Sequence, residues 1–124
     1  MDIYSENIME HYKDPRNFGK LENENASYKD SNPLCGDKIN VQLIIENDEI
    51  KEIKYECDGC AISRASSSII SEKIKGMELK DILKLNKDFV LDSLGIQLNP
   101  MRLKCAMLSL RAIQKAILNY KGEN

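Results

Sequence analysis

The sequence has no tryptophan, a single histidine and no apolar run close to the length needed to cross a membrane. Its first residues include Asp2 and Glu6, so they lack the charge pattern of a secretion signal. Basic residues are not in excess either, because 18 lysines and arginines face 20 acidic residues and are spread along the whole chain. We therefore expect a cytoplasmic protein that binds neither a membrane nor nucleic acid.

Cysteine is present four times, at positions 35, 57, 60 and 105. In a small secreted protein an even count would favour disulfide bonds, but nothing in the sequence indicates secretion. The 124 residues are enough to bury a core, which predicts one domain, 1–124. Metal or redox chemistry is therefore the favoured use of the thiols. The only histidine, His11, lies far along the chain from them, which favours a structural role.

Two adjacent segments predict a β-hairpin. Residues 39–45 alternate in polarity and are rich in β-branched side chains, and residues 50–57 alternate in the same way. The polar residues 46–49 supply the turn between them. Ahead of the hairpin, residues 26–28 carry only a hint of a short edge strand.

Apolar spacing predicts helices on both sides of this hairpin. They are expected at residues 3–12, 61–75, 77–85 and 87–94, with a last helix that reaches residue 120. This last helix has two candidate starts: Asn99 as the N-cap with Pro100 at the first helical position, or a start near Lys104. We prefer the later start, which puts Cys105 at the helix N-terminus, and the preference draws in part on a resemblance described below.

The segment Asn32-Pro33-Leu34-Cys35-Gly36-Asp37 places a thiol and a carboxylate two residues apart, just before the hairpin. Gly36 has no Cβ, so the backbone can curl and direct Cys35 and Asp37 at one centre. Taken alone, the segment fits a metal or nucleophile site and an ordinary turn with an incidental cysteine equally well.

Two more cysteines lie at junctions between predicted elements. Cys60 opens a helix after Gly59, which allows a left-handed turn, and Cys105 is expected to open the last helix. A helix N-terminus lowers the pKa of a thiol and stabilises a thiolate, a persulfide or a metal–thiolate centre, and Lys104 would act in the same direction. Since junctions at one end of a sheet can meet in space, we expect these thiols to gather with Cys35.

Cys35, Asp37, Cys60 and Cys105 together offer three soft sulfur donors and one hard oxygen donor. Four such ligands suit tetrahedral Zn²⁺, and they suit a [2Fe-2S] cluster, in which each iron takes two protein ligands. A carboxylate in place of a fourth thiolate is a mismatched and more exchangeable ligand. This donor set is therefore typical of a site whose cluster has to leave.

Cys57-Asp58-Gly59-Cys60 also matches a CxxC redox pattern, which is the competing interpretation. In thioredoxin-type proteins that pattern opens a helix within a βαβ unit, whereas here the preceding strand belongs to an antiparallel hairpin. Cys57 shares a strand face with Ile53 and Tyr55, which favours a small buried side chain over an auxiliary thiol or a spare ligand.

In these motifs the chain closely resembles the iron–sulfur cluster assembly scaffold family, that is, the IscU proteins and the N-terminal domain of NifU. The resemblance extends over nearly the whole chain. The matching segments are Tyr4-Ser5, Glu10-His11-Tyr12, Asp14-Pro15-Arg16-Asn17 with Gly19, Cys35-Gly36-Asp37, Gly59-Cys60, Ala65-Ser66-Ser67-Ser68, Lys75-Gly76 and Lys104-Cys105.

This resemblance implies an α/β (α+β) fold in which a small antiparallel three-stranded sheet packs against several helices. It implies a scaffold, not an enzyme, that accepts persulfide sulfur from a cysteine desulfurase, combines it with iron and transfers a labile [2Fe-2S] cluster to apo-proteins. The cluster ligands would be Cys35, Asp37, Cys60 and Cys105, with Asp37 keeping the cluster labile. Cys105 would be the leading persulfide acceptor and Cys35 the second. A chaperone, an iron donor and a homodimer are compatible with this family.

Three departures separate the chain from the IscU branch. Lys104 stands where that branch has a histidine, and 98–102 keeps two of the five residues of its Leu-Pro-Pro-Val-Lys chaperone segment. Lys104 and the stretch 61–63 look more like SufU, the zinc-bound sulfur-transfer branch, although the long SufU insertion is missing. The alternative is therefore a zinc-dependent sulfurtransferase that relays persulfide through Cys35. A thiol oxidoreductase using Cys57 and Cys60 is the third hypothesis.

Overall fold

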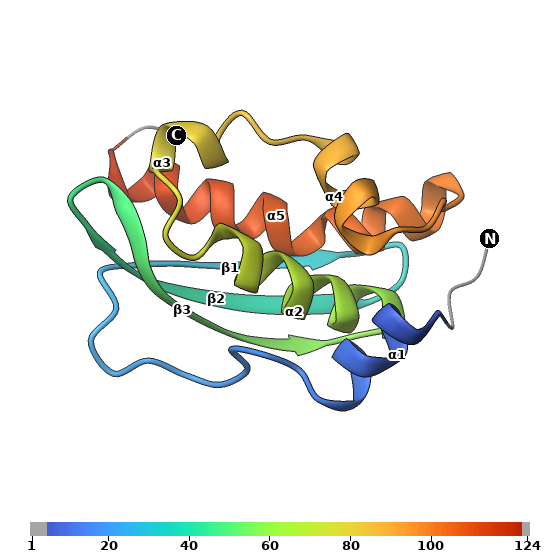
Figure 1. The fold of residues 1–124 in the computed structure, drawn as a ribbon. Helices are drawn as coiled ribbons and strands as arrows, with labels where there is room; N and C mark the ends of the chain where they lie inside the picture. The colour runs from blue at the N-terminus through green and yellow to red at the C-terminus, as the bar shows by residue number, and fades with distance from the viewer. Residues whose placement is uncertain (1–4, 123–124) are drawn as a thin grey trace.

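The computed structural model describes residues 5–122, which form a three-stranded antiparallel sheet covered on one face by helices (Figure 1). The strands are β1 (Ala26–Asn32), β2 (Asp37–Glu46) and β3 (Glu49–Asp58), in the order β1-β2-β3. The helices are α1 (Glu6–Lys13), α2 (Ala61–Ile74), α3 (Leu79–Ile82), α4 (Lys87–Leu94) and α5 (Pro100–Tyr120). Within this described part of the chain, no helix combines the length and the apolar character that crossing a membrane requires.

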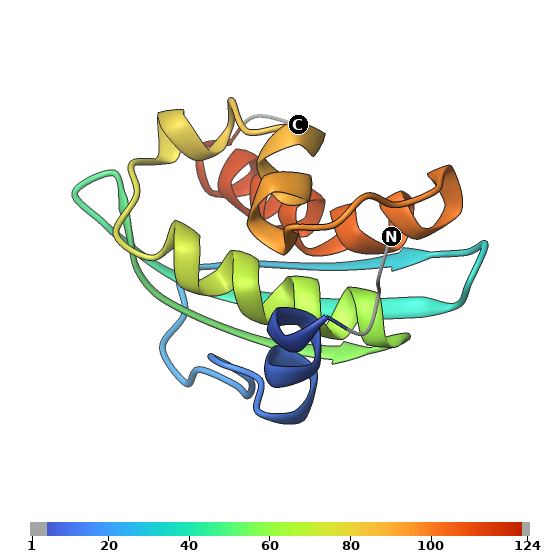
Figure 2. The ribbon, with the colours of Figure 1, turned by 45° about the vertical axis from the view of Figure 1, so that its right-hand side comes forward.

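The core lies between the sheet and the two longest helices, α2 and α5. Figures 1 and 2 show these helices side by side over one sheet face, with α4 above them and α1 against the flank of α2. Alternate residues of β2 point inward, so Ile39, Val41 and Leu43 are buried while their neighbours are partly exposed. The hairpin predicted from residues 39–45 and 50–57 is confirmed as β2 and β3, and the helix predicted at residues 61–75 is confirmed as α2.

The strand β1 is longer than the short edge strand expected at residues 26–28. It pairs with β2 along its whole length, from Ala26 opposite Leu43 to Asn32 opposite Asp37. Apolar periodicity did not reveal it because several inward positions are polar. Asp30, for example, is held by Arg111 of α5, whose Nε lies 2.9 Å from Oδ2.

The helix expected at residues 77–85 is wrong in its extent, because α3 is a single turn. The segment that leads into its first residue binds the β2–β3 turn: Ile50 N–H donates to the Met77 carbonyl at 3.0 Å, and Leu79 N–H donates to the Asp48 carbonyl at 2.9 Å. Backbone groups committed to this bridge cannot also form a helical turn. At the other end, the Gln114 amide of α5 donates to the Leu85 carbonyl at 3.0 Å, outside the helix.

The preferred late start of the last helix is also wrong. α5 begins at Pro100, and the side chain of Asn99 caps it by accepting from Arg102 N–H at 2.9 Å. The proline suits this first position because its fixed φ is already helical and its missing N–H would have had no partner. Cys105 therefore lies one turn further inside the helix than expected.

Candidate metal centre

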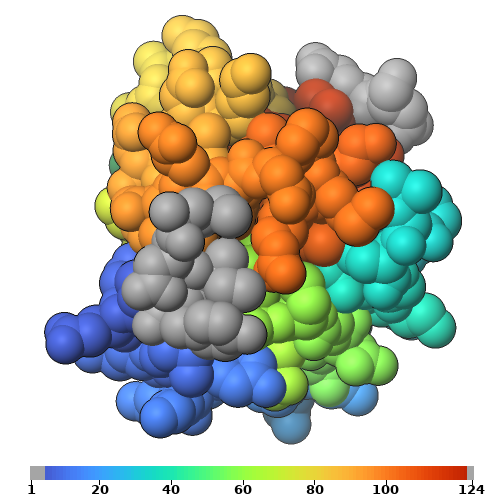
Figure 3. All heavy atoms as spheres, turned by 90° about the vertical axis from the view of Figure 1, so that its right-hand side faces the viewer, coloured from blue at the N-terminus to red at the C-terminus, as the bar shows by residue number. Residues whose placement is uncertain are grey.

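Three segments that are distant in sequence meet at one end of the sheet. They are the β1–β2 turn with Cys35, the β3–α2 junction with Cys60, and the first part of α5 with Cys105. Figure 3 looks onto this end, where cyan atoms of the turn, light-green atoms of the junction and orange atoms from the start of α5 adjoin. The sequence-based expectation that these junctions lie together agrees with this arrangement.

The β1–β2 turn is built by Asn32 and Gly36. The Asn32 carbonyl accepts from Gly36 N–H at 2.8 Å, and its side-chain oxygen accepts from Leu34 N–H at 3.1 Å. Gly36 has a φ of 74°, a left-handed conformation that a side chain would strain. The turn brings the Cys35 Sγ to 3.0 Å from the Cys105 Sγ, while Cys35 itself stays exposed.

Asp37 is the first residue of β2 and is almost completely buried, with 2% of its surface exposed. Its carboxylate oxygen and the Sγ atoms of Cys35 and Cys105 all lie within 4.8 Å of one another. Burial alone would raise the pKa of Asp37, but hydrogen bonds from the two thiols and from the Cys60 N–H outweigh it and lower the pKa. Asp37 is therefore ionised in the middle of the thiols.

Cys60 lies on the other side of Asp37. Its Sγ is 3.6 Å from Oδ2, and its backbone N–H donates to Oδ1 at 3.1 Å. Cys60 occupies the N-cap position of α2, where its side chain makes no capping hydrogen bond and remains exposed. It stays outside the tight group formed by Cys35, Asp37 and Cys105, so the described structure brings three of the four predicted donors together and holds the fourth beside them.

Gly59 is required here for close approach, not for a left-handed turn. The expectation of a left-handed turn is wrong, since its φ is outside the positive range seen at Gly36. A Cβ at this position would come within 2.6 Å of Asp37 Oδ1 and 2.5 Å of Ser63 Oγ. Only a residue without a side chain lets Asp37 sit against the β3–α2 junction.

Cys105 differs from the environment predicted for it. It is 4% exposed and lies in the second turn of α5, so the helix N-terminus does not lower the pKa of its thiol. Burial, followed by the contacts with Cys35 and Asp37, raises the pKa of Cys105 instead. Asn32 Nδ2, 3.8 Å away, is positioned to donate to the sulfur. Of the three thiols, this one is the most deeply held by the fold.

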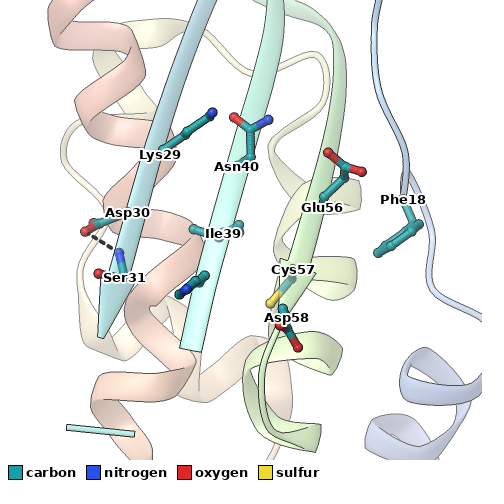
Figure 4. Close-up of a pocket in the computed structure, with 10 residues that line it drawn as sticks. Phe18, Lys29, Asp30, Ser31, Ile39, Asn40, Glu56, Cys57 and Asp58 are labelled. Atoms are coloured by element: carbon teal, nitrogen blue, oxygen red, sulfur yellow. Dashed lines mark hydrogen bonds between the residues drawn. The ribbon is translucent and has the colours of Figure 1, made fainter. Parts of the chain in front are cut away.

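Cys57 is buried, as the strand pattern indicated, with 8% of its surface exposed. Burial raises the pKa of this thiol, and its Sγ lies 3.9 Å from Ser63 Oγ. Figure 4 shows it beside an open pocket at the end of β3, where Asp58, Glu56 and Phe18 also line the wall. The thiols of the candidate metal centre do not line that pocket.

Asn32 and Ser63 support the centre, and neither role was predicted from the sequence. Asn32 forms the turn and reaches Cys105, and the Ser63 hydroxyl lies 3.7 Å from the Cys60 Sγ and donates to the Cys60 carbonyl at 3.1 Å. An asparagine directly before a proline is a turn signal, and a serine three residues after a helix N-cap is placed to bond back to it. Neither signal by itself points to a metal site.

The chain matches a known family and several known proteins. The family model described as the NifU-like N-terminal domain matches residues 3–124. The chain is 33% identical over 122 residues to the iron-sulfur cluster assembly scaffold protein IscU 1 of Archaeoglobus fulgidus, covering 98% of this chain and 79% of that protein. It is 34% identical over 139 residues to the zinc-dependent sulfurtransferase SufU of Bacillus subtilis, covering 98% of this chain and 94% of that one.

A solved structure is similar as well. The crystal structure of an iron-sulfur cluster assembly scaffold protein for the SUF system from Fervidobacterium islandicum superimposes with a TM-score of 0.80 at 28% identity, covering 93% of this chain and 96% of that one. These matches confirm both the α/β fold class and the resemblance carried by the sequence motifs.

Proposed function

Because the chain belongs to the NifU-like N-terminal domain family, we propose that it is a scaffold for iron–sulfur cluster assembly. It accepts persulfide sulfur from a cysteine desulfurase, combines it with iron as a labile [2Fe-2S] cluster, and transfers the cluster to apo-proteins. The cluster is cargo, so the chain is not an enzyme that turns over a small substrate.

The observation that carries this proposal is the donor set at the end of the sheet. Cys35, Asp37 and Cys105 keep their donor atoms within 4.8 Å of one another, and Cys60 adds a thiol 3.6 Å from the carboxylate. Ligands of one metal with bonds of about 2.3 Å lie roughly 4 Å apart, so this set fits a thiolate-bound metal with little movement. The exposure of Cys35 and Cys60 gives iron and sulfur access from solvent.

Sulfur enters at Cys35 in this proposal. The family resemblance favours Cys105 as the first acceptor, but a persulfide donor has to reach the thiol, and Cys105 is only 4% exposed. Cys35 lies on an exposed turn next to Leu34, whose apolar side chain is 61% exposed. Cys35 is therefore the first acceptor of the sulfur.

A zinc-dependent sulfurtransferase is the second candidate function, and a specific observation favours it. The chain is 34% identical to a protein named for that activity, and Lys104 precedes the last cysteine in place of a histidine. Three cysteines and one aspartate also suit four-coordinate Zn²⁺. Zinc would then be the resident metal, and Cys35 would relay the sulfur.

Anaerobic reconstitution with iron and sulfide, followed by metal analysis and visible absorption spectra, separates the two functions. Visible absorption bands and two irons per protomer support the scaffold. Tight stoichiometric zinc, stimulation of a desulfurase and no stable cluster would instead support the sulfurtransferase. We also expect Asp37→Ala to hold its cluster longer than the wild type, because the hard, exchangeable donor is gone. A shorter lifetime would contradict the role given to Asp37.

Cys57→Ala is the matched control for these measurements. Cys57 lies in the same region as Cys60 but is buried against Ser63, outside the donor set. Reconstitution should therefore survive Cys57→Ala and fail in Cys60→Ala. Loss of the cluster in both variants, or an active 57–60 disulfide in a Cys35→Ala protein, would favour a thiol oxidoreductase.

A further inference from the structure

The closest contact between two thiols in the centre joins an exposed residue to a buried one. Cys35 Sγ and Cys105 Sγ are 3.0 Å apart, yet Cys35 lies on the exposed β1–β2 turn and Cys105 is 4% exposed inside α5. A separation of roughly 3–3.5 Å between reacting atoms is that of a near-attack geometry. The Cys105 sulfur is therefore close enough to react with the Cys35 sulfur when a persulfide has formed on Cys35.

We propose that Cys105 is the resolving thiol that releases sulfide from a persulfide on Cys35. The Cys105 sulfur attacks the inner sulfur of Cys35–S–SH, a Cys35–Cys105 disulfide forms, and the terminal S–S bond breaks. The products are the disulfide and H₂S, which takes up the proton lost by Cys105. The terminal sulfur is reduced by two electrons, and the two cysteine sulfurs supply them, so no external reductant takes part. The inference rests on the proposed function, which brings the persulfide to Cys35.

The two sulfurs are supported in complementary ways. Cys105 is fixed in a helix whose neighbours Ala106 and Leu108 are fully buried, so its position is set by the core. Cys35 precedes Gly36 in a turn held by hydrogen bonds to Asn32, from Gly36 N–H to the carbonyl at 2.8 Å and from Leu34 N–H to the side-chain oxygen at 3.1 Å. Closing the gap from 3.0 Å to a disulfide bond of about 2.05 Å requires only a small shift of this turn.

Asp37 supplies a route for the proton. Its carboxylate lies within 4.8 Å of both sulfurs. The proton of Cys105 can therefore pass across the carboxylate to the departing hydrosulfide. The other thiols are engaged elsewhere: Cys60 Sγ contacts Asp37 and Ser63, at 3.6 and 3.7 Å, and Cys57 Sγ lies against Ser63 at 3.9 Å.

This step has a consequence for the cycle of the scaffold. The disulfide removes two of the four donors until a dithiol reductant reopens the centre. Sulfide delivery and metal binding at Cys35 and Cys105 then alternate, and each turnover of the pair yields one sulfide. A reductant of the dithiol class must therefore act on this chain after sulfide release.

The test uses the reduced, metal-free full chain treated with one equivalent of inorganic polysulfide, with no other thiol present. A desalting column removes the residual polysulfide and the sulfide set free by the loading reaction. The sulfide released after this column is trapped and counted over time, and the cysteine products are mapped by mass spectrometry after trypsin. Cleavage after Lys29, Lys54 and Lys104 puts Cys35 and Cys105 in separate peptides and keeps Cys57 and Cys60 together in a third. The wild type should release sulfide in step with a Cys35–Cys105 disulfide.

Cys105→Ser should keep the persulfide on Cys35 and release sulfide at least tenfold more slowly. Cys57→Ser is the matched control, since it also removes a buried thiol, and it should behave as the wild type does. Sulfide release at the wild-type rate from Cys105→Ser, or a disulfide that joins Cys35 to Cys60, would overturn the proposal. If Cys105→Ser does not fold, the wild-type map decides alone, because sulfide released without the 35–105 disulfide refutes the step.

Failure of this inference is distinguishable from failure of the proposed function. A chain that takes no persulfide on Cys35, or holds one without releasing sulfide, overturns the resolving step. The same chain would still assemble a cluster from iron and sulfide salts if it is a scaffold. A chain that assembles no cluster from those salts fails as a scaffold, whatever its thiols do.

Discussion

At the scale of single residues, the centre depends on one glycine as much as on its donors. The backbone of Gly59 runs so close to Asp37 and Ser63 that a methyl group would overlap both side chains. Asp37 is in turn the residue that all three thiols of the centre contact. The position of the carboxylate is therefore coupled to the absence of a side chain at the end of the neighbouring strand.

We predict that Gly59→Ala weakens zinc binding by about 10- to 100-fold, as expected when the support of a metal ligand is displaced. Overpacking should also lower the free energy of unfolding by about 1–3 kcal/mol. Zinc affinity is measured by competition with a chelating dye. Gly95→Ala is the matched control, because Gly95 has a φ of 73° and no atom within 4 Å of the added Cβ. It should destabilise the fold through backbone strain and leave zinc affinity unchanged.

Residue type and position were enough to single out the four proposed donors, whereas their environments could not be predicted from them. Cys35, Asp37, Cys60 and Cys105 stand out in the sequence because thiols and a carboxylate lie at junctions between elements. The burial of Cys105 and the support from Asn32 and Ser63 depend on packing between distant segments. No local pattern contains that information, so the direction of the Cys105 pKa shift was predicted with the wrong sign.

At the scale of elements, the sequence predicted those whose apolar side chains follow a regular spacing. The hairpin β2–β3 and the helices α2 and α4 agree with their predicted ranges to within about two residues. The elements that were wrong are held by polar or backbone contacts. β1 is longer than predicted and α3 is shorter, and α5 starts earlier than predicted because Asn99 caps it at Pro100.

The contact between α1 and α2 gives a prediction about pH. His11 of α1 is buried, and its Nδ1 lies 2.7 Å from the hydroxyl of Ser68 in α2. That hydroxyl already accepts from Arg16 N–H at 2.8 Å, so its own proton is available for an unprotonated Nδ1. Burial, and after it the charge of Arg16, lowers the pKa of His11 below its ordinary value of 6.5. The structural role expected for this histidine agrees with these contacts.

A folded state with a lowered histidine pKa binds fewer protons than the unfolded chain between the two pKa values. The stabilising contribution of His11 is therefore complete above pH 6.5 and is lost as the pH falls below it. At pH 7.5, His11→Gln should cost about 1 kcal/mol in urea unfolding of the metal-free protein, and at pH 5.5 this difference should shrink. Lys13→Gln, an exposed change on the same helix, should show no such pH dependence. A His11→Gln difference that stays constant between the two pH values would contradict the assignment of a neutral histidine.

At the scale of the whole molecule, the proposed centre links three segments that lie far apart in the sequence. The β1–β2 turn, the β3–α2 junction and α5 each contribute donors, and α5 packs against both α2 and β1. A metal bound by all three segments cannot be retained when any one of them separates from the others. Metal binding should therefore stabilise the entire described fold and not one loop.

We predict that zinc at 100 times its Kd stabilises the protein by about 2.7 kcal/mol. For a chain of 124 residues this corresponds to a rise in Tm of about 10 °C. Thermal unfolding followed by circular dichroism, with zinc and with a chelator, measures the shift. Cys57→Ser should keep the full shift, since Cys57 lies outside the donor set. Cys35→Ser, Cys60→Ser and Cys105→Ser should each lose most of it, because the three thiols belong to three different segments. A shift that survives loss of Cys105 would mean that zinc binds only the turn and the junction, and α5 would then have no part in holding the metal.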